Sequence, residues 1–330
     1  MRKIRVAQIG TSQYSHGSEI FRTMATNPAI FEIVGYAMPE GEREKFPHMM
    51  GTCAPYREMT GEQILADPTI EAVVVETEEI YLTKYALQVA RAGKHMHMEK
   101  PGGIDPVAFE ELIETVKRNK TVFHLGYMYR YNPCLVDILA RVQAGEIGDV
   151  ISVEAQMSGW RDEQQNRFLS AFPGGMMFYL GCHLIDLVLR IQGTPKAVLP
   201  YNKQSGAFAT ASKDFSMALF EYEHGLSFVK TTQAERGGFL RRQLGITGTK
   251  GKYEVRPLEI NVAYPMQKTE YTYCTSEEWN DAGTHVASEP FHRYEDMMLA
   301  FAAMVRGEKE NPFTYDYEWQ LYRTLCACCE

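Results

Sequence analysis

Five short apolar segments, alternating with helical patterns over the first 125 residues, constrain the fold of this chain more than any other feature. The strand-like segments span residues 5–9, 31–37, 70–75, 95–98 and 121–125. Helical apolar spacing covers residues 19–25, 82–92 and 106–118. Such alternation favours a parallel sheet, because parallel neighbours need crossover connections. The pattern predicts an α/β domain with a doubly wound parallel sheet over residues 1–124.

The remainder, residues 125–330, has a different pattern. After a helical segment at 134–144, strand-like segments follow at 151–157, 216–222, 226–232, 243–247 and 252–257. Several alternating strands in succession indicate a mostly antiparallel sheet, with one face on helices and the other open to solvent or to a second subunit. We therefore expect a second, α+β domain with a large open sheet.

Charge and cysteine content exclude several functional classes. The net charge of the 330 residues is −8 without a basic block, so we expect no nucleic-acid partner. We expect no membrane span and a cytoplasmic location, because the chain has neither an 18-residue apolar run nor a secretory segment. The seven scattered cysteines fit reduced thiols. Cys326, Cys328 and Cys329 lack a partner pair at zinc-site spacing, so we expect no metal.

The turn after the first strand is a candidate phosphate-binding turn. When a small-residue turn leads from a strand into a helix, the N-terminus of the helix offers free N–H groups and the positive end of its dipole to a phosphate. Where the dinucleotide fingerprint has three glycines, this turn has Gly10, Ser12 and Ser15. A plain strand-to-helix turn explains the residues about as well. The fingerprint has an acidic residue after the second strand, and this chain has Met38 at that position. Nearby, Glu40 could reach a ribose and Arg43 could contact a 2′-phosphate. Alternatively, both are solvated charges.

A second candidate is Glu99-Lys100-Pro101, which ends the fourth strand. In open α/β sheets, ligands bind outside the carboxyl ends of the strands. Proline narrows the backbone choices of Lys100, so this lysine could be held in a fixed direction. The alternative is a surface Glu-Lys pair beside a loop proline.

Tyr179, His183 and Asp186 form a third candidate in the second domain. They follow Pro173-Gly174-Gly175 in a helical run. At spacings of four and three they could share one helix face and relay a proton. An amphipathic helix with a satisfied core histidine is the alternative.

The order of these motifs resembles the glucose-fructose oxidoreductase, inositol dehydrogenase and MocA family of NAD(P)-dependent oxidoreductases. The resemblance runs over nearly the whole chain. It includes the N-terminal turn, Ala92-Gly93-Lys94-His95 before Glu99-Lys100-Pro101, Arg130-Tyr131-Asn132-Pro133, Gly145-Glu146-Ile147-Gly148, His183 with Asp186, and Gly248-Thr249-Lys250-Gly251. It implies a Rossmann domain, an α/β domain whose open sheet packs between subunits as a homodimer or homotetramer, and NAD or NADP as cofactor.

Residue by residue, the resemblance implies that Lys100 hydrogen-bonds the reacting hydroxyl and that His183 accepts or returns its proton. Histidine suits proton exchange at neutral pH, whereas lysine would need burial to act as a base. Tyr179 stands where members usually carry an aspartate, and we include it as a catalytic candidate. The cofactor-binding candidates are Gly10, Ser12, Gln13, Ser15, Met38, Thr77, Glu78, Glu99, Lys100 and Arg130. The substrate-binding candidates are Lys100, Tyr127, Trp160, His183 and Asp186.

The activity expected from this resemblance is hydride transfer between a nicotinamide and a sugar, an inositol or a related polyol or ketose. Two alternatives stay open. One is cleavage of a glycoside through transient oxidation by tightly held NAD, for which Tyr179 leaves room. The other is an inactive relative that binds a sugar or a partner protein, which Ser12, Ser15 and Met38 suggest because they alter the cofactor motif.

Overall fold

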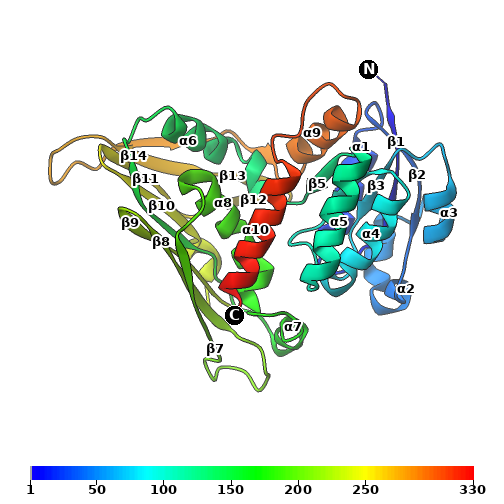
Figure 1. Ribbon diagram of the computed structural model, residues 1–330, viewed down its shortest axis with the longest axis horizontal. Coiled ribbons are helices and arrows are strands. Elements are labelled where there is room, and N and C mark those ends of the chain that lie inside the picture. Colours follow the sequence, from blue (N-terminus) through cyan, green and yellow to red (C-terminus); the bar gives the residue numbers. More distant parts are fainter. Residues whose placement is uncertain (1) are drawn as a thin grey trace. The chain divides into compact units, whose positions relative to one another are not determined.

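A computed structural model of the chain, which describes residues 2–330, divides into two compact units (Figure 1). Of the described residues, the first unit comprises 2–128 and 294–320, and the second comprises 129–293 and 321–330. Residues 294–320, which the sequence analysis assigned to the second domain, thus belong to the first unit. Hydrogen bonds from Asn311 to the carbonyl of Phe123 (2.8 Å) and from Tyr315 to that of Thr121 (2.7 Å) hold them there.

A five-stranded, entirely parallel sheet forms the centre of the first unit, in the order β2-β1-β3-β4-β5. Its strands are β1 (Ile4–Ile9), β2 (Phe31–Ala37), β3 (Ala72–Val75), β4 (His95–Met98) and β5 (Phe123–Leu125). All four residues of β3 are fully buried, as the middle strand of a parallel sheet should be. The doubly wound parallel sheet predicted from the sequence is confirmed.

Helices surround this sheet in the first unit (Figure 1). They are α1 (Gly17–Thr26), α2 (Glu42–Lys45), η1 (Pro47–Thr52), α3 (Gly61–Ala66), η2 (Glu79–Tyr81), α4 (Leu82–Arg91), α5 (Pro106–Asn119) and α9 (Glu295–Val305). The start of α5 shows how local sequence sets a boundary. Asp105 caps it by accepting the N–H groups of Val107 and Ala108, and Pro106 occupies the first helical position, where no N–H is needed.

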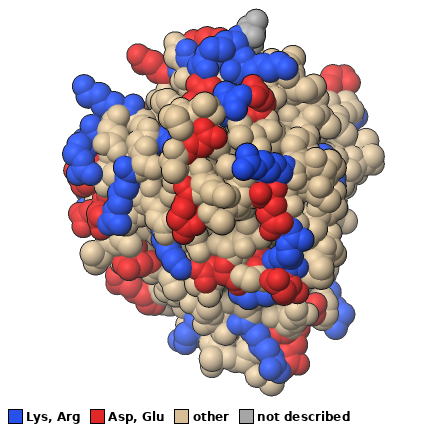
Figure 2. Space-filling view, turned by 90° about the vertical axis from the view of Figure 1, so that its right-hand side faces the viewer, with Lys and Arg blue, Asp and Glu red and all other residues tan. Residues whose placement is uncertain are grey.

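Acidic and basic side chains are interspersed over the face of the molecule shown in Figure 2. In the first unit, charged side chains form surface ion pairs, such as Arg2 with Glu71 at 2.7 Å and Arg91 with Glu111 at 2.5 Å. Exposed pairs of this kind contribute about 0–1 kcal/mol each. The stability of this unit therefore rests mainly on its buried sheet.

An eight-stranded sheet dominates the second unit, in the order β15-β14-β11-β10-β6-β9-β8-β7. The strands are β6 (Val150–Gln156), β7 (Ala197–Lys203), β8 (Phe215–Tyr222), β9 (Gly225–Thr232), β10 (Gln243–Gly248), β11 (Gly251–Val255), β14 (Glu270–Cys274) and β15 (Thr284–Ala287). Only the β6–β9 pair is parallel among these described strands. The predicted large, mostly antiparallel sheet is confirmed. A small sheet of β12 (Ile260–Ala263), β13 (Met266–Lys268) and β16 (Phe291–His292) lies apart from it.

One face of the large sheet is covered by helices of the same unit (Figure 1). Helix α8 packs on β6 and β9 and also contacts α6. The helices and turns of this unit are η3 (Met128–Tyr131), α6 (Pro133–Gln143), α7 (Glu163–Leu169), η4 (Met177–Gly181), α8 (Cys182–Gln192) and η5 (Gly238–Arg241). Helix α10 (Tyr315–Cys328) begins in the first unit and ends in the second. Inward-facing residues such as Ala155, Ala218 and Val229 are fully buried.

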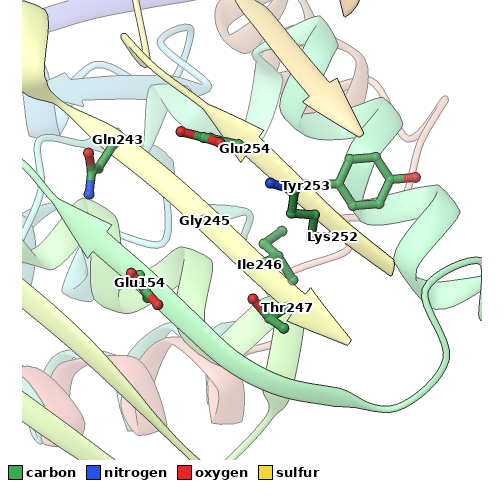
Figure 3. A pocket seen from close by; sticks show the side chains of 8 residues that line it. All are labelled: Glu154, Gln243, Gly245, Ile246, Thr247, Lys252, Tyr253 and Glu254. Atoms are coloured by element: carbon green, nitrogen blue, oxygen red, sulfur yellow. The ribbon is translucent and has the colours of Figure 1, made fainter. Parts of the chain in front are cut away.

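On each strand of this sheet, the residues between the inward-facing ones point to the other face. A row of residues in register crosses all eight strands on that face: Leu199, Leu219, Phe228, Glu154, Gly245, Glu254, Thr272 and His285. The row is apolar at its β7–β9 end and polar beyond it. Gly245 has no side chain, and a hollow of about 210 Å³ opens beside it between the charged side chains (Figure 3).

All seven cysteines are free thiols. Within residues 2–330, no group of three or more His, Cys, Asp or Glu side chains is arranged to hold a metal ion. Across the same described range, every helix is too short or too polar to cross a membrane.

Candidate active site

The carboxyl ends of β1, β3 and β4 form the candidate site in the first unit. In the order β2-β1-β3-β4-β5, the connection after β1 leads to β2 on one side, whereas the connection after β3 leads to β4 on the other. The strand order thus reverses between β1 and β3, and open α/β sheets bind their ligands in the crevice at such a reversal. Predicted site residues follow all three strands: Gly10 and Ser12 after β1, Thr77 and Glu78 after β3, and Glu99 and Lys100 after β4. The parallel strand order thus brings these candidates together at the carboxyl ends of the strands.

The turn from β1 to α1 has the geometry of a glycine-dependent turn. Gly10 has φ +86°, and a Cβ on it would lie 2.6 Å from the backbone of Thr77. Ser12 donates its backbone N–H to the carbonyl of Glu76 (3.1 Å), and the Ser15 hydroxyl donates to the same carbonyl (3.0 Å). Gln13 is half-buried beside them. At the start of α1 the N–H of Gly17 donates to the Ser15 hydroxyl (3.0 Å). The positive end of the helix dipole and the close backbone approach at Gly10 suit a phosphate-bearing cofactor.

At Gly17, helix α1 comes close to the residue that follows β3. The dinucleotide fingerprint assigns this role to its third glycine. A Cβ on Gly17 would lie 2.9 Å from the side chain of Glu76. The sequence analysis placed Ser15 at that position and did not consider Gly17. The helix begins at Gly17, two residues before the predicted start, which explains the omission.

Two charged candidates near the end of β2 are held by other side chains. Glu40 accepts hydrogen bonds from Lys84 and from the Tyr85 hydroxyl (2.7 Å). Arg43 is paired with Glu58. Met38, which occupies the position of the ribose-binding acid, is half-buried.

A buried carboxylate that the sequence analysis missed lies at the same crevice. Glu42, the first residue of α2, accepts the N–H groups of Thr11 (2.9 Å) and Glu78 (3.2 Å), which follow β1 and β3. Burial raises the pKa of Glu42 to about 7, although those two N–H groups lower it. Residues 40–45 alternate charges like an exposed segment, so no local signal distinguishes Glu42 from Glu40 or Glu44.

Lys100 is buried at the end of β4, with an exposed fraction of 1%. Its Nζ lies 3.4 Å from the carboxylate of Glu99, which also contacts Nδ1 of His16 at 3.0 Å, and the Lys100-Pro101 peptide bond is cis. Burial raises the pKa of nearby Glu79 to about 8, an effect that Lys100 opposes. The interpretation of Glu99-Lys100 as an exposed pair is therefore wrong.

The candidate residues of the second unit surround α8. His183, with an exposed fraction of 1%, packs edge-on against Tyr129, with ring centroids 5.2 Å apart. Asp186 holds Arg130 through two guanidinium nitrogens, with Nη2 at 2.8 Å and Nε at 3.1 Å from Oδ1. This buried, forked ion pair ties η3 to α8 across 56 positions of sequence.

Tyr179 does not lie in the α-helix that the sequence analysis assumed. It belongs to η4, a π-helical turn, so α-helical spacing does not relate it to His183. Its ring packs against Phe168 and Phe172, with centroids 6.0 and 6.4 Å away. The expected α-helix therefore does not include Tyr179, whereas His183 and Asp186 both lie on α8.

The two remaining aromatic candidates differ in exposure. Trp160 has 45% of its surface exposed and stacks with Arg236, whose guanidinium lies 5.1 Å from the ring centroid. Tyr127 is buried, with an exposed fraction of 1%. Trp160 thus offers an accessible ring face, and Tyr127 belongs to the core around β5.

The doubly wound sheet with its glycine turn and buried Lys100, together with the large-sheet unit around His183, defines a nucleotide-dependent oxidoreductase of two units. Comparison with known families identifies it further. Residues 4–127 match the oxidoreductase family with an NAD-binding Rossmann fold, and residues 136–254 match the GFO/IDH/MocA C-terminal domain. The chain belongs to the GFO/IDH/MocA family of oxidoreductases, and NAD or NADP is its cofactor.

Curated relatives match with modest identity. An uncharacterized oxidoreductase from Rhizobium meliloti is 25% identical over 268 residues, which cover 79% of this chain and 76% of the relative. The scyllo-inositol 2-dehydrogenase (NADP(+)) IolW from Bacillus subtilis (strain 168) is 28% identical over 139 residues, or 42% of this chain and 39% of the relative. The match to that dehydrogenase thus spans less than half of its length.

Solved structures match over the whole chain. Levoglucosan dehydrogenase in complex with NADH and levoglucosan has a TM-score of 0.79 at 18% identity, covering 99% of this chain and 96% of that one. Aldose-aldose oxidoreductase from Caulobacter crescentus, complexed with glycerol, has a TM-score of 0.77 at 18% identity with the same coverage. At these identities the likeness establishes the fold.

Proposed function

We propose that this oxidoreductase transfers a hydride between a nicotinamide and the carbinol or carbonyl carbon of a sugar, an inositol or a related polyol. The observation that carries the proposal is Lys100, a buried lysine at the carboxyl end of β4, on the sheet edge where a Rossmann domain binds its ligand. The names of the scyllo-inositol 2-dehydrogenase and levoglucosan dehydrogenase relatives support this substrate class.

Lys100 and His183 divide the proton chemistry in this proposal. The nicotinamide supplies hydride chemistry when bound. Lys100 donates a hydrogen bond to the reacting oxygen and lowers the energy of the negative charge that develops there. His183 takes the hydroxyl proton during oxidation and returns it during reduction, because an imidazole exchanges protons near neutral pH.

Gly10, Ser12, Gln13, Ser15, Thr77 and Glu78 surround the crevice that would hold the cofactor. Calorimetric titration of the purified full chain with NAD, NADH, NADP and NADPH tests the proposal. Binding of a nicotinamide nucleotide is the expected result, and no heat from any of the four at millimolar concentration would refute the function.

The Lys100→Met variant should lose turnover while keeping its fold. Methionine fills a similar volume but cannot donate a hydrogen bond to the developing oxyanion, and loss of one such donor lowers kcat by about 10²–10³-fold. Steady-state kinetics of nicotinamide reduction measures the effect, and thermal unfolding shows whether the variant is folded.

The matched control for this variant is Lys84→Met on α4, which removes an exposed lysine paired with Glu40. Its kcat should stay near that of the parent chain. Equal turnover of Lys100→Met and the parent chain would exclude Lys100 from the chemistry.

A further inference from the structure

Two buried glutamates lie side by side in the first unit, where β3 and β4 end. Val75 on β3 is in register with Met98 on β4. The next pair along the strands is Glu76 and Glu99, and the N–H of Glu99 donates to the carbonyl of Val75 (2.9 Å). Neighbouring strands of a sheet are about 4.8 Å apart. Two buried carboxyl groups at this spacing repel each other when both are ionised.

Glu99 is the member of this pair that has positive charge beside it. Its Oε1 lies 3.4 Å from Nζ of Lys100, and its Oε2 lies 3.0 Å from Nδ1 of His16. The side chains of Glu99 and Lys100 are 1% exposed, whereas that of His16 is 23% exposed and packs on the ring of Tyr294, with centroids 5.3 Å apart. Glu99 is therefore the carboxylate that balances the charge of Lys100.

The basic group in contact with Glu76 is a neutral imidazole. Oε1 of Glu76 lies 3.6 Å from Nε2 of His97, and neither carboxyl oxygen has a hydrogen-bond partner within residues 2–330. Burial lowers the pKa of His97 to about 4, although the charge of Glu99 opposes this, so His97 is uncharged at neutral pH. Nδ1 of His97 faces Nδ1 of His124 at 2.7 Å. A buried carboxylate without a positive partner is strongly unfavourable, so Glu76 holds a proton instead.

The surroundings of Glu76 agree with a protonated carboxyl group. Burial, and then the charge of Glu99, raise the pKa of Glu76, and the hydroxyl group of Ser15 opposes them. Glu79 in η2 is a second buried acid, whose pKa burial raises to about 8 against the opposing charge of Lys100. At neutral pH this cluster thus holds one matched ion pair, Glu99 with Lys100, beside acids that keep their protons.

A further positive charge at this end of the sheet would change that state. In the proposed function Lys100 contacts the oxygen on the reacting carbon, and hydride transfer requires that carbon to touch the nicotinamide ring. The ring then has to lie close to Lys100 and to the carboxyl groups beside it. An oxidised nicotinamide carries a positive charge, whereas a reduced one is neutral. Only the oxidised form therefore favours the ionised state of a nearby carboxyl group.

We propose that Glu76 gives up its proton when the oxidised cofactor binds, so that the chain distinguishes oxidised from reduced nicotinamide by proton release. The proton leaves through Glu99 and His16, the partly exposed member of the cluster, and is taken up by the medium. Ionised Glu76 then balances the nicotinamide charge as Glu99 balances that of Lys100. This inference rests on the proposed function and adds to it a group that responds to the oxidation state of the cofactor.

Calorimetric titration of the full chain in phosphate and in Tris, which differ in ionisation enthalpy, counts the protons released on binding. The ligands are NAD and NADH, or NADP and NADPH, whichever pair binds. The phosphates and the adenosine are the same in both forms of a pair, so the comparison isolates the nicotinamide charge. At pH 7 the oxidised form should release up to about one proton more than the reduced form, and its relative affinity should rise up to about tenfold per pH unit.

Glu76→Gln should abolish the extra proton release, because an amide of the same shape has no acidic proton. Its affinity for the oxidised form should also fall relative to that for the reduced form. The matched control is Glu110→Gln, an exposed position on α5, which should release protons like the parent chain. If Glu76→Gln does not fold, Glu79→Gln decides the assignment, because it should keep the extra release.

Equal proton release by the oxidised and reduced forms would overturn the proposal. An extra release that survives in Glu76→Gln, or one that disappears in Glu79→Gln, would do the same. These outcomes leave the oxidoreductase function standing, because the nucleotides still bind. Failure of all four nucleotides to bind is a different result, which refutes the proposed function and this inference together.

Discussion

At the scale of single residues, the crevice of the first unit is set apart by buried ionisable groups. Glu76, Glu79, Glu99 and Lys100 each have an exposed fraction of 1% or less. Burial, and then the charge of Glu99, raise the pKa of Glu76 well above its ordinary value. Perturbed groups of this kind cluster at functional sites, and they also make stability depend on pH.

Glu79 should make the cofactor-free chain less stable as the pH rises. Its pKa is about 8 in the folded state against an ordinary value of 4.5, so between these values the folded chain keeps a proton that the unfolded chain releases. The unfolding free energy contributed by Glu79 therefore falls from pH 4.5 to pH 8. Glu79→Gln should remove this contribution, so its advantage over the parent chain should grow across that interval.

Urea unfolding of Glu79→Gln and of the parent chain at pH 5.0 and pH 8.5 gives the difference between their unfolding free energies. The titration of all other groups cancels in this difference. Glu110→Gln, which removes an exposed carboxyl group on α5, controls for the substitution itself. An advantage of Glu79→Gln that stays constant with pH would show that Glu79 is not buried as a neutral acid.

Asp186 should matter for stability because it holds Arg130. Asp186→Asn leaves a buried guanidinium without its charge partner, which should lower the unfolding free energy by about 3–5 kcal/mol. Urea unfolding at pH 7 measures the loss. The control is Glu163→Gln in the exposed pair with Arg167, for which we expect a change of about 0.5 kcal/mol or less. Equal effects would mean that the Arg130–Asp186 pair is not buried as described.

At the scale of elements, turn geometry determines where the site residues stand. The turn after β1 needs a residue without a side chain, and the π-helical turn before α8 directs Tyr179 toward Phe168 and Phe172. Both depend on local backbone conformation that apolar periodicity does not reveal.

Gly10→Ala should therefore disturb the site more than the addition of one methyl group suggests. The added Cβ would meet the Thr77 backbone at 2.6 Å and occupy a positive φ, so we expect a loss of more than about 1 kcal/mol of stability and weaker nucleotide binding. Gly61→Ala, at the start of α3 with open space around it, should be neutral or slightly stabilising. Thermal unfolding and NADH titration of both variants check the prediction, which fails if they behave alike.

At the scale of the whole molecule, the open face of the large sheet carries apolar side chains on three paired strands. Leu199, Leu219 and Phe228 lie side by side across β7, β8 and β9. Such a face suits packing against a second copy of the chain, as the expected homodimer or homotetramer requires.

Phe228→Glu should weaken that assembly by placing a charge in the middle of the apolar row. Sedimentation velocity should show an oligomer for the parent chain and a smaller species for the variant. Val107→Glu, on an exposed position of α5, should leave the mass unchanged. A monomeric parent chain, or a variant of unaltered mass, would count against assembly through this face.

Sequence reasoning placed most strands of both sheets within about two residues, because burial imposes a local period that one segment displays by itself. It also placed Lys100 at the end of a strand. It did not find β7, β14 and β15 of the large sheet, nor helix α9, nor Gly17 as the start of α1. Local pattern therefore predicts elements better than it predicts the contacts of polar residues.

The amino-acid sequence by itself determined the doubly wound sheet, the large open sheet and the order of the Lys100 and His183 motifs. The tertiary structure decided the partners: Glu42 accepts the N–H groups of Thr11 and Glu78, and Asp186 holds Arg130. The physical reason is range. Periodicity reflects burial along a few consecutive residues, whereas a charge interacts with whichever groups the fold brings near, however distant they are in sequence.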